Sequence, residues 1–333
     1  MGVVKTLAPR VAEAGFSGVV IAEAGRTAYL SCAAAALSAE LDILTGVAVA
    51  FPRSPMVTAQ VAWELAEASG GRFRLGLGTQ VRAHIERRYG CAFDPPGPRM
   101  REYVLAIRAA FNAFGSGEPL HYQGDFYQLS LLPPMWSPGP ISVPTPPVDI
   151  AAVNPWMLRL AGEVADGVHV HPLNHEKYLH ETVVPNLALG AEGAGRRLDD
   201  LEVIVPAFLV VGDTSEEQER WREMARMQVA FYGSTPNYGF IFDQLGFEGT
   251  TARIRQYQKR GDLAGMAAVI TDEILEHFII SGTWDGIADA IRARYLGTAT
   301  RVVSYFGSMA IDEGPESWDR WAAVARRVTQ PAG

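Results

Sequence analysis

Three side chains of this sequence have the chemistry to move protons and stand where expected strands end. Glu23 closes the apolar run 15–23, His171 closes the run 166–171, and His84 follows the run 72–78 by a few residues. Histidine titrates near neutral pH and therefore suits a proton relay. We interpret His171, His84 and Glu23 as candidate catalytic residues; the alternative is that they only satisfy polar groups or hold loops.

A metal site is the other chemistry that the histidines suggest. His169 and His171 are two residues apart, so in a strand they would share one face. No third or fourth ligand follows at a useful spacing, because His175 belongs to the next expected helix. We therefore expect no metal. With only two cysteines, Cys32 and Cys91, the chain is not expected to be a disulfide scaffold or a cysteine-rich metal protein.

A glycine pair in RFRLGLGTQ, residues 72–80, suggests a dinucleotide-binding loop. That loop requires G-x-G-x-x-G, in which the third glycine lets a helix pack on a strand. Gly76 and Gly78 supply the first two glycines, but Val81 stands at the third position. The stretch is therefore interpreted as a strand whose glycines let another group approach the backbone.

A regular alternation of strand-like and helix-like segments has to position these residues. Apolar strand-like runs occupy residues 15–23, 41–51, 72–78, 146–154, 166–171, 201–212 and 300–307. Helix-like segments occupy residues 5–14, 30–40, 55–69, 99–114, 155–165, 175–194, 214–231 and 283–295. A small hairpin at 121–130 is expected to turn at Gln123-Gly124. Continuously apolar runs are typical of parallel strands covered on both faces.

The alternation predicts an α/β fold, a (β/α)₈ TIM barrel that residues 1–333 form as a single domain. Seven strands are recognised, and the missing first strand is expected before the first helix, where the chain has only MGVV. Residues 232–280 break the rhythm and are interpreted as an insertion. Residues 132–147 carry seven prolines and are expected to form a surface loop.

The composition argues against several classes of protein. The 333 residues carry a net charge of −8, which makes nucleic acid an unsuitable partner, because phosphate binding needs a basic face. No apolar run approaches the ~18 residues of a membrane helix, and the N-terminal segment has no signal-peptide core. We expect no membrane partner and a cytoplasmic protein, for which the low cysteine content is suited.

In a (β/α)₈ barrel the chemistry lies at the C-terminal ends of the strands. Many residues at those ends are small or glycine, as if a flat cofactor lay against the backbone. The positions at these ends are Glu23, 46–50, 78–80, 153–154, 169–171 and Gly212. This arrangement places two histidines and a glutamate at one mouth, where a small-molecule substrate is expected.

The sequence resembles the luciferase-like superfamily of flavin and deazaflavin (coenzyme F420) oxidoreductases over nearly its whole length. The matching blocks, in order, are IAEAGR, TGVAVAFPRSP, ELAEASGGRFRLGLGTQVRAHIERR, the GDFY hairpin, PPVDIAAVNPWM, LAGEVADGVHVHP and AFYGSTPNY. SGGRFRLGLGTQ and AGEVADG are strong signals jointly, and FYGSTPNY is closest to an F420-dependent subgroup. The resemblance implies a luciferase-like barrel with an insertion.

The resemblance also implies where a cofactor binds. The tricyclic ring of F420, or of FMN as the alternative, is expected to rest on a bulge in which the peptide bond between Gly46 and Val47 is cis. Val49 and Glu23 are expected beside that ring, and Gly78, Thr79 and Gln80 would face it from the next strand. The ribityl-phosphate tail is expected at a helix start, where free N–H groups favour an anion; the residues there are Val153, Asn154, Trp156 and Met157.

The sequence departs from the family pattern at three places. Asn154 stands where glycine is common, which is a mild change because asparagine tolerates unusual backbone angles. In F420-dependent sugar-phosphate dehydrogenases of the family, an acidic-His pair ends the second strand and a glutamate follows the fourth-strand glycines. Here those positions hold Glu23-Ala24 and Val81. The substrate and the mechanism of those enzymes are therefore not expected here.

Three functions are open on this barrel. The first is an F420-dependent oxidoreductase that transfers a hydride between deazaflavin C5 and a small organic substrate. The second is an FMN-dependent monooxygenase that needs a partner reductase, and the third is a non-catalytic ligand-binding barrel. Because the family is usually dimeric, the alanine-rich helices 30–40 and 55–69 are expected in a homodimer interface. Two interpretations are open for Arg53, Arg72 and Arg74: contact with a phosphate or an acidic tail, and surface or interface ion pairs, which we prefer.

Overall fold

The structure is a computed structural model that describes residues 1–309 and 314–329. The chain divides into two compact units. The first contains Met1–His169 and Asn186–Glu202, and the second contains Val170–Pro185 and Val203–Gly333. The expectation of a single domain over residues 1–333 stays a prediction.

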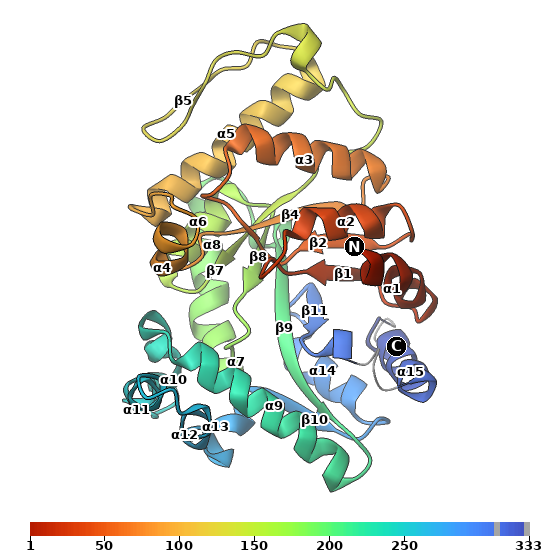
Figure 1. The fold of residues 1–333 in the computed structure, drawn as a ribbon, viewed down its shortest axis with the longest axis vertical. Helices are drawn as coiled ribbons and strands as arrows, with labels where there is room; N and C mark the ends of the chain where they lie inside the picture. The colour runs from red at the N-terminus through yellow and green to blue at the C-terminus, as the bar shows by residue number, and fades with distance from the viewer. Residues whose placement is uncertain (310–313, 330–333) are drawn as a thin grey trace. The chain divides into compact units, whose positions relative to one another are not determined.

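A parallel sheet forms the centre of the first unit, with strands in the order β1-β2-β4-β7-β8 and with β3 beside β4 (Figure 1). The strands are β1 (Gly18–Ile21), β2 (Asp42–Thr45), β3 (Ala48–Val49), β4 (Phe73–Gly78), β7 (Val148–Ala152) and β8 (Gly167–Val170). All four residues of β8 and four of the five residues of β7 are buried. Burial without alternation is what parallel strands covered on both faces require, as predicted.

Six helices accompany these strands: α1 (Gly2–Glu13), α2 (Ala28–Ala36), α3 (Pro55–Ala68), α4 (Arg82–Arg87), α5 (Pro96–Ser116) and α6 (Pro155–Val164). Helix α3 begins at Pro55, as predicted, and Ser54 caps it by accepting a hydrogen bond from Val57 N. Gly70 and Gly71 follow its end with positive φ angles. Helices α3 and α5 pack side by side (Figure 1). Between them the ring of Trp63 stacks on that of Phe111, with the ring centroids 5.4 Å apart.

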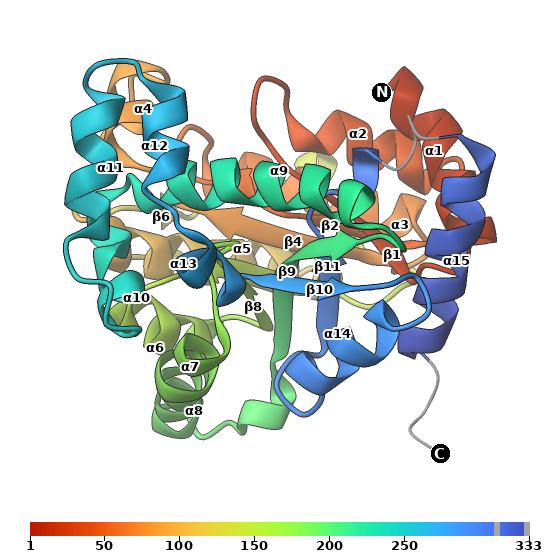
Figure 2. The ribbon, with the colours of Figure 1, turned by 90° about the horizontal axis from the view of Figure 1, so that it is seen from below.

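The second unit is built around most of β9 (Glu202–Val211), which pairs in parallel with β10 (Ile279–Gly282) and β11 (Arg301–Ser304). Helix α9 (Ser215–Gly233) begins with a capping box between Thr214 and Glu217. Figure 2 shows short helices packed along α9 and against one another. The helices of this part are α10 (Gly239–Asp243), α11 (Thr250–Gln258), α12 (Leu263–Ala268), α13 (Asp272–Glu276), α14 (Ile287–Tyr295) and α15 (Pro315–Thr329).

Several predicted elements differ from the structure. The run 41–51 is two strands, because β2 ends at Thr45 and β3 starts at Ala48. The helix expected at 175–194 is interrupted by a π-helical turn, Leu179–Val183, between α7 (Glu176–Tyr178) and α8 (Val184–Gly193). The predicted insertion at 232–280 is folded into helices, and β10 begins inside it. Apolar periodicity was weak in these short helices, so sequence patterns missed them.

The hairpin consists of β5 (Tyr122–Gln123) and β6 (Gln128–Leu129), so Gln123 lies in a strand and the turn begins one residue later than predicted. A distant carboxylate decides the position of the turn. Glu102 accepts hydrogen bonds from the N–H groups of Asp125 and Phe126 at 2.9 and 2.8 Å. Within residues 1–309 and 314–329, no helix has both the length and the apolar character needed to cross a bilayer.

Candidate functional site

The segment between β2 and β3 forms a bulge at Gly46 and Val47, and the peptide bond between these two residues is cis, as predicted. Both residues are partly exposed, whereas Thr45 and Ala48 on either side are fully buried. The hydroxyl of Thr45 replaces the interrupted strand pairing: it donates to Gly76 O at 2.7 Å and accepts from Gly76 N at 2.8 Å. The bulge therefore presents backbone at the surface of a rigidly bonded sheet.

The glycines of RFRLGLG face the protein's own atoms. A Cβ atom on Gly76 would collide with the carbonyl oxygen of Thr45 and lie 2.5 Å from Nε2 of His169. A Cβ atom on Gly78 would lie 2.6 Å from Cγ2 of Val47. The groups that approach these glycines are therefore the bulge and its supporting side chains, and Gly78 itself is buried.

Glu23 joins the end of β1 to the far side of the bulge. Its carboxylate accepts a hydrogen bond from Val49 N at 2.7 Å and forms an ion pair with both terminal nitrogens of Arg53, at 2.9 and 2.5 Å. The side chain of Glu23 is 4% exposed, so its ion pair with Arg53 is largely interior. The preferred prediction for Arg53 was a surface or interface ion pair. The contacts of Glu23 hold β3, and they occupy both carboxylate oxygens; its proposed catalytic role stays a prediction.

Replacing Glu23 with glutamine is expected to lower the free energy of unfolding by about 2 kcal/mol, because the neutral amide leaves the half-buried Arg53 guanidinium without its counter-charge. Urea unfolding measures the change. Glu163→Gln is the matched control, since Glu163 pairs with Arg101 on the surface, and its cost should stay within about 0.5 kcal/mol. Equal losses in the two variants would contradict the interior role of Glu23.

The residues after β4 are accessible. Thr79 is partly exposed, and Gln80 is exposed with a φ of 57°, the left-handed region that non-glycine residues rarely adopt. The Gln80 side chain accepts from Val81 N at 3.1 Å, which holds the turn into α4. His84 is exposed on α4. Val49, in contrast, is 2% exposed, so the structure buries this predicted neighbour of the ring beneath the surface.

The start of α6 carries the predicted tail-binding residues. Asn154 is its N-cap and accepts a hydrogen bond from Met157 N at 2.9 Å, so one of the free N–H groups is already satisfied. Val153 and Met157 are partly exposed, and Trp156 is 49% exposed. The Trp156 ring covers Gly97 at the start of α5, where a Cβ would collide with it. Trp156 therefore packs on α5, and its predicted contact with the cofactor tail stays a prediction.

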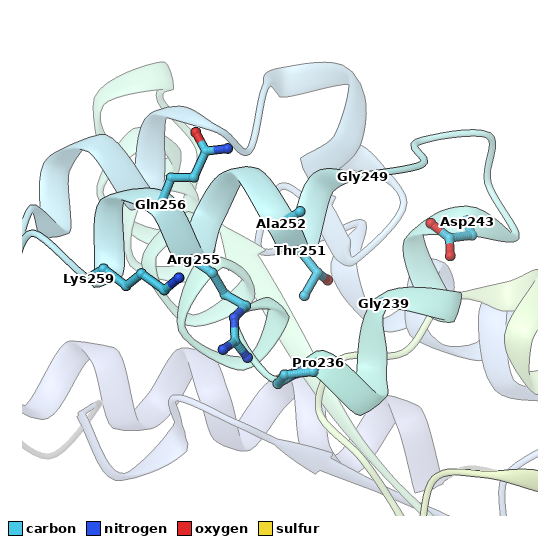
Figure 3. A pocket seen from close by; sticks show the side chains of 9 residues that line it. All are labelled: Pro236, Gly239, Asp243, Gly249, Thr251, Ala252, Arg255, Gln256 and Lys259. Atoms are coloured by element: carbon cyan, nitrogen blue, oxygen red, sulfur yellow. The ribbon is translucent and has the colours of Figure 1, made fainter.

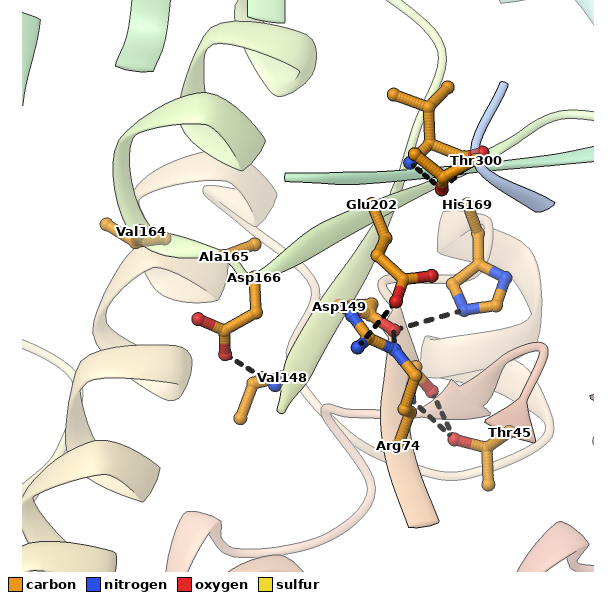
Figure 4. Close-up of polar contacts among 12 residues, drawn as sticks. Thr45, Arg74, Val148, Asp149, Val164, Ala165, Asp166, His169, Glu202 and Thr300 are labelled. Carbon is orange, nitrogen blue, oxygen red and sulfur yellow. Dashed lines mark hydrogen bonds and ion pairs between the residues drawn. The ribbon is translucent and has the colours of Figure 1, made fainter. Parts of the chain in front are cut away.

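A buried charged network lies deeper in the same sheet, and sequence reasoning missed it (Figure 4). Arg74 on β4 binds both carboxylate oxygens of Asp149 on β7, at 3.0 and 2.6 Å, and also reaches Glu202 at 3.2 Å. Asp149 is fully buried, and burial raises its pKa to about 6 although Arg74 opposes that shift. The prediction of a surface ion pair for Arg74 is wrong, because β4 directs this side chain toward β7.

His169 on β8 lies beside this network. Its side chain is 8% exposed, and Nε2 lies 3.9 Å from Oδ2 of Asp149 (Figure 4). Burial, assisted by the positive charge of Arg74, lowers the pKa of His169 to about 3, so the ring is neutral at pH 7. Sequence reasoning placed His169 at a strand end and weighed it as a metal ligand, but did not connect it with Arg74 and Asp149. In the part of the chain that the structure describes, no group of three His, Cys, Asp or Glu side chains could hold a metal ion.

His171 belongs to the second unit, where aromatic rings surround it. Its ring centroid lies 4.7 Å from that of Tyr232 and 4.5 Å from that of Tyr238. Nδ1 of His171 accepts a hydrogen bond from Leu173 N at 3.0 Å, so the neutral ring carries its proton on Nε2. The Tyr232 hydroxyl lies 2.5 Å from that of Tyr305. Both His171 neighbours come from FYGSTPNY, a block that indicated the family but was not interpreted as part of a site.

Acid is expected to destabilise the protein, because burial lowers the pKa values of His169, His171 and His175 from 6.5 to about 3, 3 and 4. Unfolding frees these rings to bind protons below pH 6.5, so their contribution to stability is lost as the pH falls. The raised pKa of Asp149 acts in the opposite direction between about pH 6 and 4 and offsets one proton. The free energy of unfolding should fall by roughly 2–3 kcal/mol per pH unit near pH 5. Urea titrations at pH 7, 6 and 5 measure the slope, which His84→Gln should leave unchanged.

Two surface hollows are lined by other residues. One, of about 640 Å³, lies in the predicted insertion between α11 and the α10 segment (Figure 3); its lining includes Arg255, Lys259 and Asp243. The other, of about 260 Å³, is lined by Met56 and Gln60 of α3 and by residues 131–133 and 136 of the proline-rich loop. Neither hollow is lined by a predicted cofactor residue, so hollow size does not locate the site.

Comparisons with known proteins agree on one family. Residues 3–301 match the family model described as luciferase-like monooxygenase. An uncharacterized protein of Mycobacterium tuberculosis is 39% identical over 293 residues, which cover 88% of this chain and 86% of that protein. A 5,10-methylenetetrahydromethanopterin reductase of Archaeoglobus fulgidus is 30% identical over 266 residues, which cover 78% of this chain and 75% of the reductase.

Solved structures show the fold. The coenzyme F420 dependent tetrahydromethanopterin reductase from Methanopyrus kandleri aligns with a TM-score of 0.77 at 22% identity, covering 98% of this chain and 94% of that one. The oxygenating constituent of 3,6-diketocamphane monooxygenase from Pseudomonas putida, solved with FMN, aligns with a TM-score of 0.66 at 16% identity, covering 99% and 93%. The predicted luciferase-like (β/α)₈ fold class is confirmed by these similarities.

Proposed function

The chain belongs to the luciferase-like monooxygenase family, and on this premise we propose that it is a coenzyme F420-dependent oxidoreductase. It transfers a hydride between C5 of the deazaflavin and a small organic substrate. The observation that carries the proposal is the Gly46–Val47 bulge, whose two residues are partly exposed beside buried neighbours. Two similarities support the choice of F420: the 30% identity to a methylenetetrahydromethanopterin reductase, and the fold shared with a tetrahydromethanopterin reductase whose structure is described as coenzyme F420 dependent.

The residues around the bulge fit a flat ring. Gly46 offers no side chain, Val47 packs over Gly78, and Glu23 uses its carboxylate on Arg53 and Val49. What is left for a ligand is an apolar, backbone-lined surface. At the start of α6, Pro155 has no N–H and Asn154 takes the Met157 N–H, so the Trp156 N–H is left for the anionic tail of the cofactor, with Val153 and Met157 around it. Thr79 and Gln80 flank the ring from the end of β4.

F420, when bound, supplies a hydride donor or acceptor at C5 of its ring. The chain's own residues orient and protonate. Glu23 accepts from the N–H of Val49 and Arg53 donates to its carbonyl oxygen, and together they hold the position of β3. His171 carries its proton on Nε2, because Nδ1 accepts from Leu173 N, and this Nε2–H is the proton that it offers to a substrate. His84, exposed after β4, is the second candidate for the same role.

FMN-dependent monooxygenation is the second candidate function, and the similarity to an FMN-bound oxygenating constituent favours it. The two functions differ at the cofactor tail, because FMN ends at its phosphate whereas F420 continues into a lactyl-oligoglutamate chain. A monooxygenase would also need reduced FMN from a partner reductase. The bulge accepts either ring, so the tail decides between them.

Fluorescence titration of the purified protein with oxidised F420 and with FMN tests the proposal. We expect F420 to bind at least about tenfold more tightly than FMN, which corresponds to about 1.4 kcal/mol. Tighter binding of FMN would favour the monooxygenase. If F420 binds but its absorbance does not change when a panel of alcohols, aldehydes and imines is added, no hydride is transferred, and a ligand-binding barrel would be favoured. Binding of neither cofactor would overturn the proposal.

We also propose that the protein is a homodimer that associates through α2 and α3. Leu30 and Leu37 of the α2 segment are 53% and 79% exposed, and Val57 of α3 is 49% exposed. Apolar side chains grouped on neighbouring helices are typical of an interface. Light scattering should give twice the chain mass of 36.1 kDa, and Leu37→Glu should give the monomer mass. A wild-type protein at the monomer mass would contradict the dimer.

A cytoplasmic location is part of the same proposal. Cys32 and Cys91 are free thiols, which suits a reducing compartment. A soluble cofactor and a small-molecule substrate are the expected partners. Fractionation of cells that produce the protein should recover it with the cytoplasmic enzymes.

A further inference from the structure

His169 is a buried polar side chain that packing alone does not explain. Nε2 of its ring is buried and has no hydrogen-bond partner among the residues that the structure describes. Oδ2 of Asp149 lies 3.9 Å away, beyond hydrogen-bonding distance. An unpartnered buried nitrogen destabilises a folded protein, and an apolar side chain of similar volume would avoid that cost. The imidazole is therefore expected to have a use in another state of the protein.

The ring of His169 occupies the space that Gly76 leaves and lies at ordinary contact distance from Gly46, where Val20 fills the space of a Cβ. A Cβ atom on Gly46 would lie 3.5 Å from Cε1 and 3.6 Å from Nδ1 of the ring, and one on Gly76 would lie 2.5 Å from Nε2. One edge of the ring thus faces the bulge, and the Nε2 side faces β4 and Asp149. A movement of about 1 Å from the bulge side would bring Nε2 within hydrogen-bonding distance of Oδ2.

The acceptor is held still for such a contact. Arg74 binds both oxygens of Asp149, and Gly167 leaves room for the carboxylate, since a Cβ there would lie 2.6 Å from Oδ1. Burial keeps the imidazole neutral, because the pKa of His169 is lowered to about 3. The ring therefore has one proton to donate, and the fixed carboxylate can accept it in a hydrogen bond.

We propose that His169 is a positioning residue for the cofactor: a ring bound on the Gly46–Val47 bulge closes the gap between Nε2 of His169 and Oδ2 of Asp149, and the new hydrogen bond increases cofactor affinity. The inference rests on the proposed function, because it needs a cofactor on this bulge. It has a distinctive consequence. Removing the nitrogen should weaken cofactor binding while it spares, or increases, the stability of the cofactor-free protein.

His169→Met and His169→Gln test the inference. Methionine adapts to the space without a donor, whereas the amide of glutamine can still donate to Asp149. We expect the dissociation constant of the cofactor that binds wild-type protein, F420 or FMN, to rise about fivefold to tenfold in His169→Met. His169→Gln should stay within about twofold of wild type. The urea midpoint of cofactor-free His169→Met should be no lower than that of wild type. His121→Gln, on the exposed hairpin, is the matched control.

Nitrogen-15 NMR of labelled histidines gives a readout that is independent of activity. Addition of the cofactor should shift His169, identified by its absence in His169→Gln, toward the tautomer with its proton on Nε2, and should leave His121 unchanged. Unchanged affinity in His169→Met, or an equal loss in His169→Gln, overturns the inference, while binding of F420 by the wild-type protein upholds the proposed function. If wild-type protein binds neither cofactor, both are overturned.

Discussion

Replacing Arg74 with methionine is expected to lower the free energy of unfolding by roughly 3–5 kcal/mol at pH 7. Asp149 is fully buried, and Arg74 supplies its charge partner and two of its hydrogen bonds. Without the guanidinium, the carboxylate must either stay charged in an apolar interior or take up a proton. Urea or thermal unfolding of the cofactor-free protein measures the loss.

The pH dependence of this loss identifies its cause. Because burial already raises the pKa of Asp149 to about 6, removal of Arg74 should raise it further, and the destabilisation should be smaller at pH 5 than at pH 7. The double variant Arg74→Met/Asp149→Asn should be more stable at pH 7 than Arg74→Met alone. Arg197→Met is the control, since Arg197 and Asp199 are each 76% exposed, and it should change stability by less than about 0.5 kcal/mol. A pH-independent loss in Arg74→Met would mean that packing, and not charge, is responsible.

Gly76→Ala is expected to destabilise the protein by about 3 kcal/mol, at the upper end of what one added methyl group costs in a packed interior. The new Cβ would collide with the backbone carbonyl of Thr45 and lie 2.5 Å from Nε2 of His169. Since the Thr45 hydroxyl bonds to both the N–H and the carbonyl of Gly76, the strand cannot move without breaking those bonds. The bulge should shift with them, so cofactor affinity should fall as well.

Gly115→Ala is the matched control for that prediction. Gly115 lies inside α5, and the nearest atom to an added Cβ there is on Trp63 at an ordinary 3.6 Å. Alanine should therefore stabilise this helix by up to about 1 kcal/mol. Stability changes of opposite sign for the two substitutions would confirm that the lack of space around Gly76, and not the loss of a glycine as such, destabilises Gly76→Ala. Similar small effects would contradict it.

Local sequence signals were sufficient to predict helices and strands whose residues interact mainly with their neighbours in the chain. Ser54-Pro55 and Gly70-Gly71 delimit α3 because a side-chain cap, a fixed proline φ and positive glycine φ angles all act within a few residues. The apolar runs at 72–78 and 166–171 became buried parallel strands, because continuous apolar residues suit strands that are covered on both faces. The short helices between 234 and 276 were not predicted, because a helix of five or six residues shows too little apolar periodicity.

The sequence alone identified the family and the α/β pattern, because contiguous motifs carry both, and the resemblance to the family implied the cis bond at Gly46–Val47. What surrounds that bulge depends on the tertiary structure. Arg74 and Asp149 are 75 residues apart in the chain, and their pairing depends on two strands becoming neighbours in the sheet. The same holds for Glu23 with Arg53 and for His169 between two glycines. Charge partners and close contacts are set by strand order and register, which no local pattern of residue types encodes.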